Sequence, residues 1–185
     1  MSQAARHPLR TFRDRTPVLG ERVFVDPSAV VTGDVALGDD VSVWPHTVIR
    51  GDIHRIRVGA RCSIQDGSVL HVTHAGPYNP DGWPLTLGDD VTLHPNCVLH
   101  DGVHLADGVT VQAGAVLGQD GFGFDSDATG HTHLPHHGGV RVGEGVLIGA
   151  NSTVARGMIA DTRLGAGTVV DAQVVIAHNC DIGPH

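Results

Sequence analysis

The fold is decided by residues 85–114, which read LTLGDD-VTLHPN-CVLHDG-VHLADG-VTVQAG and repeat every six positions. In each repeat two inward residues flank one outward residue, polar in four of the five, which is the alternation of a short strand with one buried face. Glycine, aspartate or asparagine then follows, and these residues accept the positive φ that a tight corner needs. Each repeat is therefore expected to form one short strand and one corner of a triangular coil.

The same repeat occurs on both sides of this stretch, at residues 35–46, 140–151 and 168–185. Stacked coils of three repeats bury a column of Val, Leu and Ile that no single coil could bury alone. We predict an all-β fold, a parallel β-helix forming one domain over residues 17–185, after a lead-in at residues 1–16. The left-handed sense comes from a resemblance to the hexapeptide-repeat class. A β-sandwich is the alternative, but its strands recur at irregular spacings of roughly 8–12 residues.

Composition agrees with a solenoid, because 25 glycines accompany only four Phe, two Trp and one Tyr. The three cysteines, Cys62, Cys97 and Cys180, occupy inward positions without Cys-x-x-Cys spacing, which favours core packing over disulfides or a zinc knuckle. The net charge of −8 disfavours a nucleic-acid partner. No apolar run reaches the roughly 20 residues of a membrane span, and residues 1–15 lack the apolar region of a secretory signal. We therefore expect a cytoplasmic protein.

Two segments interrupt the repeat and are expected to leave the coil as loops. Residues 74–84 are rich in Gly, Pro and Asn, and residues 119–139 contain Gly-Phe-Gly-Phe at 121–124. Loops on a rigid scaffold often carry binding groups. The second segment also holds a histidine cluster, for which we expect a solvated loop, with metal scavenging as the alternative. Its members are His131, His133, His136 and His137.

Residues 8–93 resemble the γ-class carbonic anhydrase family. The motifs that carry the resemblance are VWP at 43–45, VIRGD at 48–52, IQDGSVLHVTH at 64–74, YNPDG at 78–82 and PLTLG at 84–88. The resemblance implies a homotrimer that holds a divalent metal between subunits with three histidines, two from one subunit and one from its neighbour. It also implies hydration of carbon dioxide to bicarbonate, with Zn²⁺, Fe²⁺ or Co²⁺ as the metal.

Carried onto this sequence, the family's first and third ligands fall on His71 and His100. Each directly follows an inward leucine, so both should lie at matching places on their coils. The second ligand falls on Pro95, and the histidine here is His94, one residue early. A displacement of one residue can re-aim a side chain. His94 is therefore a candidate ligand only if its corner relaxes, and surface histidines without metal are the alternative for His71 and His100.

Five further residues match the family's polar site. Gln65 matches the residue that hydrogen-bonds the metal-bound water, and His74 lies where the family can place a proton shuttle. Arg50, Asp52 and Asp66 match the polar group at the subunit boundary, with a trimer salt-bridge network without chemistry as the alternative.

Residues 91–185 resemble another family, the UDP-3-O-acylglucosamine N-acyltransferases of lipid A synthesis. The shared motifs are HPN at 94–96, AGAVLG at 113–118, DGFGF at 120–124, GGV at 138–140, IGAN at 148–151, RG at 156–157 and IAHN at 176–179. The resemblance implies that His178 acts as a general base on a glucosamine amine that attacks the thioester of an acyl carrier protein. The family's N-terminal domain is replaced here by the carbonic-anhydrase-like coils.

The sequence thus reads as a hybrid, with carbonic-anhydrase-like coils at 17–93 and acyltransferase-like coils at 94–185. The leading hypothesis is metal-dependent hydration of carbon dioxide at trimer interfaces. One alternative is a hexapeptide acyltransferase that uses an acyl carrier protein, and the other is an inactive or designed trimeric scaffold. Partners in the leading hypothesis are further copies of the chain and a small substrate such as carbon dioxide or bicarbonate, without nucleic acid or membrane.

Overall fold

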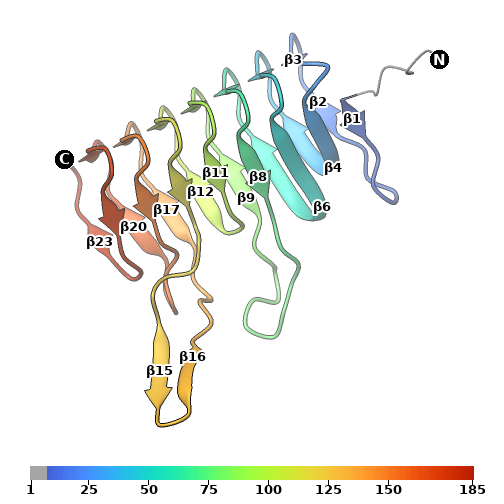
Figure 1. The fold of residues 1–185 in the computed structure, drawn as a ribbon. Helices are drawn as coiled ribbons and strands as arrows, with labels where there is room; N and C mark the ends of the chain where they lie inside the picture. The colour runs from blue at the N-terminus through green and yellow to red at the C-terminus, as the bar shows by residue number, and fades with distance from the viewer. Residues whose placement is uncertain (1–7) are drawn as a thin grey trace.

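The computed structural model describes residues 8–185, and over these residues the chain forms stacked triangular coils of short strands (Figure 1). The all-β, left-handed parallel β-helix of hexapeptide repeats predicted from the sequence is confirmed. Of the lead-in at 1–16, residues 1–7 lie outside the described part. The rest already joins the coil, because β1 (Leu9–Arg10) pairs in parallel with β4 (Val30–Leu37). Within residues 8–185 no helix is long and apolar enough to cross a membrane.

The first face of the coil is a parallel sheet of seven two-residue strands. Each strand presents its second residue toward the core and its first residue outward, as the six-residue pattern requires. In spatial order these strands are β3 (Phe24–Val25), β5 (Ser42–Val43), β7 (Ser63–Ile64), β10 (Thr92–Leu93), β13 (Thr110–Val111), β18 (Leu147–Ile148) and β21 (Val169–Val170).

The second and third faces belong to one sheet that bends around a corner, because β4 and β6 (Val48–Val58) run through both faces. The second face adds β8 (Val69–His71), β11 (Val98–Leu99), β14 (Val116–Leu117), β19 (Thr153–Val154) and β22 (Val175–Ile176) to β1. The third face consists of β2 (Val18–Leu19), β9 (Leu85–Leu87), β12 (Val103–Leu105), β17 (Val140–Val142), β20 (Thr162–Leu164) and β23 (Asp181–Ile182).

Parallel register stacks equivalent residues into columns that form the core. Leu70 pairs with Leu99, which pairs with Leu117, and all three side chains are fully buried. Cys62 and Cys97 are also buried in this core, and Cys180 is half-buried against it, so the interpretation of the cysteines as packing residues is confirmed. Burial raises the pKa of the Cys62 and Cys97 thiols to about 11.

The corner between the first and second faces, called here the second corner, comprises residues 65–68, 94–97 and 112–115. Its turns need the left-handed backbone region, which Asn96 occupies with φ 62° and Gly67 with φ 68°. The hydroxyl of Ser68, fully buried, donates to the carbonyl of His94 over 3.2 Å and accepts from the Cys97 amide over 3.2 Å. This side chain therefore fastens two successive coils at the corner that carries His94.

The corner between the second and third faces, called here the loop corner, comprises residues 51–55, 72–84, 100–102, 118–139, 155–161 and 177–180. Both predicted loops leave the coil here, and Figure 1 shows them extending from the same edge. The longer one is more ordered than expected, because β15 (Phe124–Asp127) and β16 (Gly130–His133) pair as an antiparallel hairpin. All insertions of the solenoid thus gather on one side.

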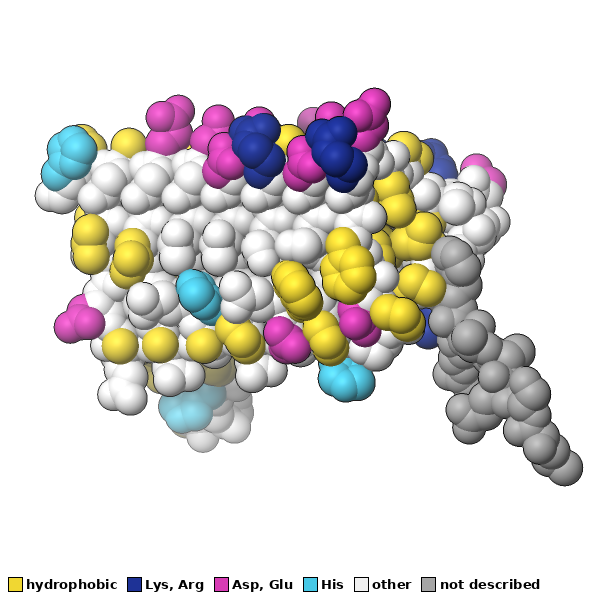
Figure 2. Space-filling model, turned by 90° about the horizontal axis from the view of Figure 1, so that it is seen from above, with side chains coloured by type: hydrophobic (Ala, Val, Ile, Leu, Met, Phe, Trp, Pro, Cys, Tyr) yellow, Lys and Arg dark blue, Asp and Glu magenta, His cyan; other side chains and the backbone are white. Residues whose placement is uncertain are grey.

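The remaining corner, at residues 38–41, 59–62 and 88–91, carries ion pairs between successive coils. Arg22 donates to Asp40 over 2.7 Å, and Arg61 donates to Asp90 over 2.7 Å. Figure 2 shows acidic and basic side chains side by side along one edge of the molecule. Exposed pairs of this kind add little free energy each, so this edge contributes modestly to the stacking of the coils.

Candidate functional site

Two of the predicted metal ligands lie one above the other at the loop corner. His71 ends β8 and His100 directly follows β11, and the pairing of Leu70 with Leu99 places the two histidines on successive coils. Arg50 pairs in register with His71 from the coil below. The prediction that His71 and His100 follow inward leucines at matching places on their coils is therefore confirmed. Their role as metal ligands stays a prediction.

The environment of His71 contains two polar atoms without partners. Nε2 of His71 and Oδ1 of Asp52 are buried, have no hydrogen-bond partner within residues 8–185, and lie 3.9 Å apart. The other carboxylate oxygen of Asp52 accepts a 2.9 Å hydrogen bond from Arg50. Buried polar atoms are almost always satisfied, so an orphaned pair indicates a place built for a further group.

Both stacked histidines favour the neutral, ligating form of imidazole. Burial lowers the pKa of His71, and the charge of Arg50 lowers it further while Asp52 opposes this. Burial likewise lowers the pKa of His100, with Asp101 acting in the opposite direction. Since only neutral imidazole binds a metal, both rings stay competent at lower pH than a free histidine.

The other matched residues lie on the second corner. Leu93 pairs with Ile64, so the residues that follow them, His94 and Gln65, stack on successive coils. Strands β8 and β11 of the second face separate this pair from His71 and His100. A single chain therefore brings together Arg50, Asp52, His71 and His100 at one corner, and leaves Gln65, Asp66 and His94 at another.

His74 and Asp66 are both exposed. His74 stands at the start of the 72–84 segment, three residues beyond His71. Asp66 offers its backbone carbonyl to the amide of Asn96 over 2.8 Å and so takes part in holding the second corner.

His178, the candidate base of the acyltransferase reading, lies at the loop corner after β22. The side-chain amide of Asn179 donates to its Nδ1 over 3.0 Å, and the orientation of that amide is set because Met158 N donates to its Oδ1 over 2.7 Å. Nδ1 is thus an acceptor, which places the proton of the neutral ring on Nε2. In this arrangement no lone pair of His178 is free to take a proton from an amine.

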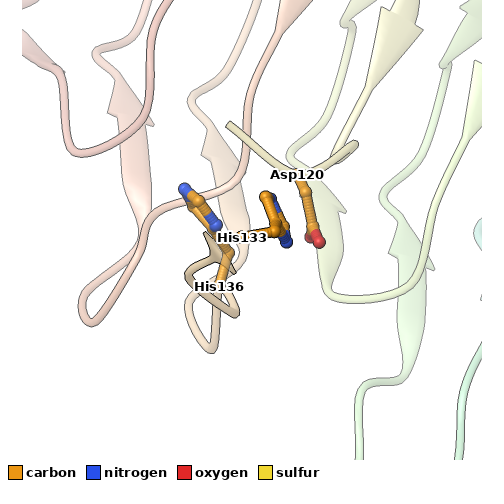
Figure 3. Close-up of side chains that lie close together, drawn as sticks. All are labelled: Asp120, His133 and His136. Carbon is orange, nitrogen blue, oxygen red and sulfur yellow. The ribbon is translucent and has the colours of Figure 1, made fainter. Parts of the chain in front are cut away.

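A second group of possible metal ligands includes two members of the predicted histidine cluster and one residue, Asp120, that the sequence did not single out as a ligand. Asp120, His133 and His136 converge beside the hairpin, with one ligand atom from each within 4.8 Å of the others (Figure 3). The expectation of a solvated histidine loop is wrong for His136, which is only 5% exposed. The clustered histidines of residues 131–137 were the signal in the sequence, and they supported metal scavenging only as the alternative.

Sequence reasoning also gave no role to Arg156, which ties the two loops to the coil. Its side chain is buried and donates to Asp101 Oδ2 over 2.8 Å and to the carbonyl of Gly138 over 3.0 Å. Its guanidinium also lies 6.0 Å from the ring centre of Trp83 in the shorter loop. The two loops touch each other as well, since Tyr78 and His137 stack with ring centres 4.1 Å apart.

Comparison with protein families agrees with this architecture. The family described as bacterial transferase hexapeptide (six repeats) matches this chain at residues 16–51 and 84–119. The family described as hexapeptide repeat of succinyl-transferase matches it at residues 139–178. A solved hexapeptide transferase family protein from Anaplasma phagocytophilum is similar in fold, with a TM-score of 0.61 at 24% identity over 90% of this chain and 76% of that one. The fold and the repeats make this chain a hexapeptide-repeat β-helix protein.

Relatives of both resembled families are found. Protein YrdA of Escherichia coli is 61% identical over 85 residues, which is 46% of each chain. Gamma carbonic anhydrase 1, mitochondrial, of Arabidopsis thaliana is 36% identical over 125 residues, 64% of this chain and 45% of the relative. UDP-3-O-acylglucosamine N-acyltransferase of Pseudomonas syringae is 33% identical over 161 residues, 87% of this chain and 42% of the relative. The chain spans less than half the length of these relatives.

Proposed function

We propose that this chain is a metal-dependent hydratase of carbon dioxide, of the γ-carbonic-anhydrase kind, whose sites lie between copies in a trimer. The observation that carries the proposal is the orphaned pair at the loop corner, His71 Nε2 and Asp52 Oδ1. His100 follows the paired leucine of the next coil, so two imidazoles lie on successive coils of one corner. Relatives named carbonic anhydrase support the same reading.

His71 and His100 are ligands of the type that Zn²⁺ and related divalent metals prefer, but the described residues of one chain do not supply a third ligand beside them. Within residues 8–185, the one group of three possible ligands found close together is the hairpin cluster, which does not include His71 or His100. A third donor therefore has to come from another copy, and the second corner, with His94 above Gln65, is the surface that presents imidazole and amide groups outward. This is the reason for placing the site between subunits.

The chain's own residues have distinct tasks in this scheme. His71 and His100 would hold the ion, which when bound supplies the Lewis acidity that activates water at neutral pH. Arg50 fixes one oxygen of Asp52, so the other oxygen stays directed to His71 and can accept a hydrogen bond from water. Gln65 of a neighbouring copy would orient that water, and the exposed imidazole of His74 would pass its proton to solvent.

The first test is metal content per chain, with every protein carrying His133→Ala so that the hairpin cluster does not contribute. We expect about one equivalent in this parent, and at least about tenfold less in His71→Ala and His100→Ala. His104→Ala is the matched control, because His104 is also half-buried and has its pKa lowered by burial. It should leave metal content unchanged.

Stopped-flow hydration of carbon dioxide and light scattering complete the test. Activity should follow metal content across the variants, and the parent should scatter as a trimer. A parent with under about one-tenth equivalent of metal, equal to that of its histidine variants, would show that the proposal is wrong. A monomeric mass would remove the basis for a site between copies.

Acyl transfer is the second candidate, and one contact favours it. The backbone of the Gly-Phe-Gly-Phe segment packs on His178 so closely that a Cβ at Gly121 would lie 2.6 Å from the imidazole Cδ2. The hydrogen bond from Asn179 to His178 disfavours it, because it occupies the lone pair of Nδ1. The test is thioester consumption with an acylated carrier protein and a UDP-glucosamine acceptor. Absence of turnover excludes this function, and absence of turnover in both assays leaves the scaffold alternative.

A further inference from the structure

We propose that Asp120, His133 and His136 form a second divalent-metal site at the base of the hairpin, completed within one chain. This site does not depend on the proposed hydration of carbon dioxide. Its ligand atoms, one from each side chain, all lie within 4.8 Å of one another. Figure 3 shows His133 standing between Asp120 and His136, with the three side chains turned toward a common space.

The protonation of His136 is already that of a metal ligand. Nδ1 donates to the carbonyl of Leu134 over 3.0 Å, which places the proton of the neutral ring on that nitrogen. Nε2 then carries the lone pair, and it is buried without a hydrogen-bond partner within residues 8–185. A histidine oriented through one nitrogen by a backbone carbonyl, with the other nitrogen free, is the usual second-shell arrangement of a metal-binding imidazole.

The hairpin explains why residues 120, 133 and 136 meet. Strands β15 and β16 fold the segment back on itself, and Leu134 N donates to the carbonyl of Gly123 over 2.9 Å at the base of the hairpin. Gly121 runs beside the imidazole of His136, where a Cβ would lie 2.8 Å from Nε2. A larger residue at position 121 would therefore fill the space in front of the free nitrogen.

The charges around the site are compatible with a cation. Arg156 Nη1 lies 4.0 Å from Asp120 Oδ1, but its closer partner is Asp101. The ring of His178 meets the ring of His136 edge-on, with centres 5.1 Å apart, and the ring of His133 stacks on that of His136 with centres 5.7 Å apart. Asp120 thus supplies the one carboxylate of the group.

Two imidazoles and one carboxylate select the class of metal. Ca²⁺ and Mg²⁺ prefer sites made of oxygen atoms, whereas imidazole suits Zn²⁺ and its divalent transition-metal neighbours. Three protein ligands leave at least one coordination position open, as in sites that bind water or a substrate. The structure therefore points to a zinc-type site with an open position beside His178.

The experiment titrates chelator-treated protein with Zn²⁺ by calorimetry and with Co²⁺ by visible absorption. All proteins carry His71→Ala, which removes a ligand of the proposed site between copies. We expect one equivalent bound per chain in this parent, and at least about tenfold weaker binding in His133→Ala and in Asp120→Asn. Both altered side chains are exposed, so neither change removes core packing.

His131→Ala is the matched control, because His131 lies on the same hairpin and bonds Ser126 instead of joining the cluster. It should bind both metals as the parent does. The proposal fails if His133→Ala binds like the parent, or if His131→Ala loses as much affinity as His133→Ala, which would indicate loose chelation by exposed histidines. Since the parent lacks His71, either failure leaves the proposed hydration site untouched.

Discussion

Arg156 donates from one side-chain nitrogen to both the carboxylate and the backbone carbonyl of Asp101, over 2.8 and 2.7 Å. Both side chains are nearly buried, and the two residues lie 55 positions apart in the sequence. The pair connects the coil that carries His100 to the coil that follows the hairpin. Arg156 also donates to the carbonyl of Gly138 at the end of the longer loop, so its side chain joins that loop to the coil of His100.

Replacing Arg156 by methionine should destabilise the protein by about 3–5 kcal/mol, because it leaves the charge of Asp101 buried without its partner. Urea unfolding followed by circular dichroism measures this. Arg141→Met is the matched control, since Arg141 also pairs with an aspartate, Asp161 over 2.8 Å, but is exposed. The Arg141→Met variant should lose no more than about 1 kcal/mol in the free energy of unfolding. Equal losses for the two variants would contradict the structural role of Arg156.

Moving the second histidine by one position should strengthen the site between copies. The double change His94→Gly with Pro95→His places the imidazole where the carbonic anhydrase resemblance expects it. We expect the Zn²⁺ affinity of the site between copies and the hydration rate to rise by about tenfold or more over the unchanged chain, because one residue re-aims a side chain at a corner. His94→Gly alone is the control and should lower both the affinity and the hydration rate. If neither rises in the double variant, the second corner is not the source of the third ligand.

Removing the hydroxyl of Ser68 should destabilise the second corner. Ser68→Ala leaves the part-buried carbonyl of His94 and the buried amide of Cys97 without that partner, at a cost of about 1–3 kcal/mol. Ser63→Ala, a half-buried position on β7 of the same coil, should cost less than about 0.5 kcal/mol. Chemical denaturation compares the two. A loss for Ser68→Ala no larger than that for Ser63→Ala would argue against this fastening.

Stability should decline in mild acid partly because of His104. Burial lowers its pKa, with Arg141 acting in the same direction and Asp161 against it, and Thr86 hydrogen-bonds its Nδ1. As pH falls, the unfolded chain takes up the proton first, near its ordinary pKa of about 6.5. The contribution of neutral His104 is therefore present above about pH 6.5 and is lost as pH falls through the lowered folded pKa.

The free energy of unfolding at about pH 7.5 and about pH 5 measures this dependence. His104→Gln, which keeps a hydrogen-bonding side chain for Thr86, should show a smaller decline between the two pH values than the unchanged protein. An equal decline would assign the acid sensitivity to other histidines of the chain.

Much of the fold could be predicted because a six-residue period is a local property. Leu70 and Leu99 occupy the same place in their repeats, so their histidine successors had to stack once the coils did. The position of the two loops followed from where the period breaks. The interpretation of Cys62 and Cys97 as core residues succeeded for the same reason.

The candidate sites could be predicted only in part. His136 is buried because the segment after β16 returns to the coil, where His137 N donates to the carbonyl of Met158, and periodicity does not describe a segment that leaves the repeat. The tautomer of His178 depends on how Met158 orients the amide of Asn179. Such hydrogen bonds join residues that no repeat relates, so no sequence pattern indicates them.

By itself the sequence determined the coil, its aliphatic core, its inward cysteines and the stacking of His71 with His100. The tertiary structure decided that His94 and Gln65 lie on a different corner from those histidines, and that Asp120, His133 and His136 converge. The physical reason is that strand register follows from burying each repeat's apolar residues. Whether polar side chains meet depends instead on the three-dimensional path of the chain at the corners and in the hairpin of the loop corner.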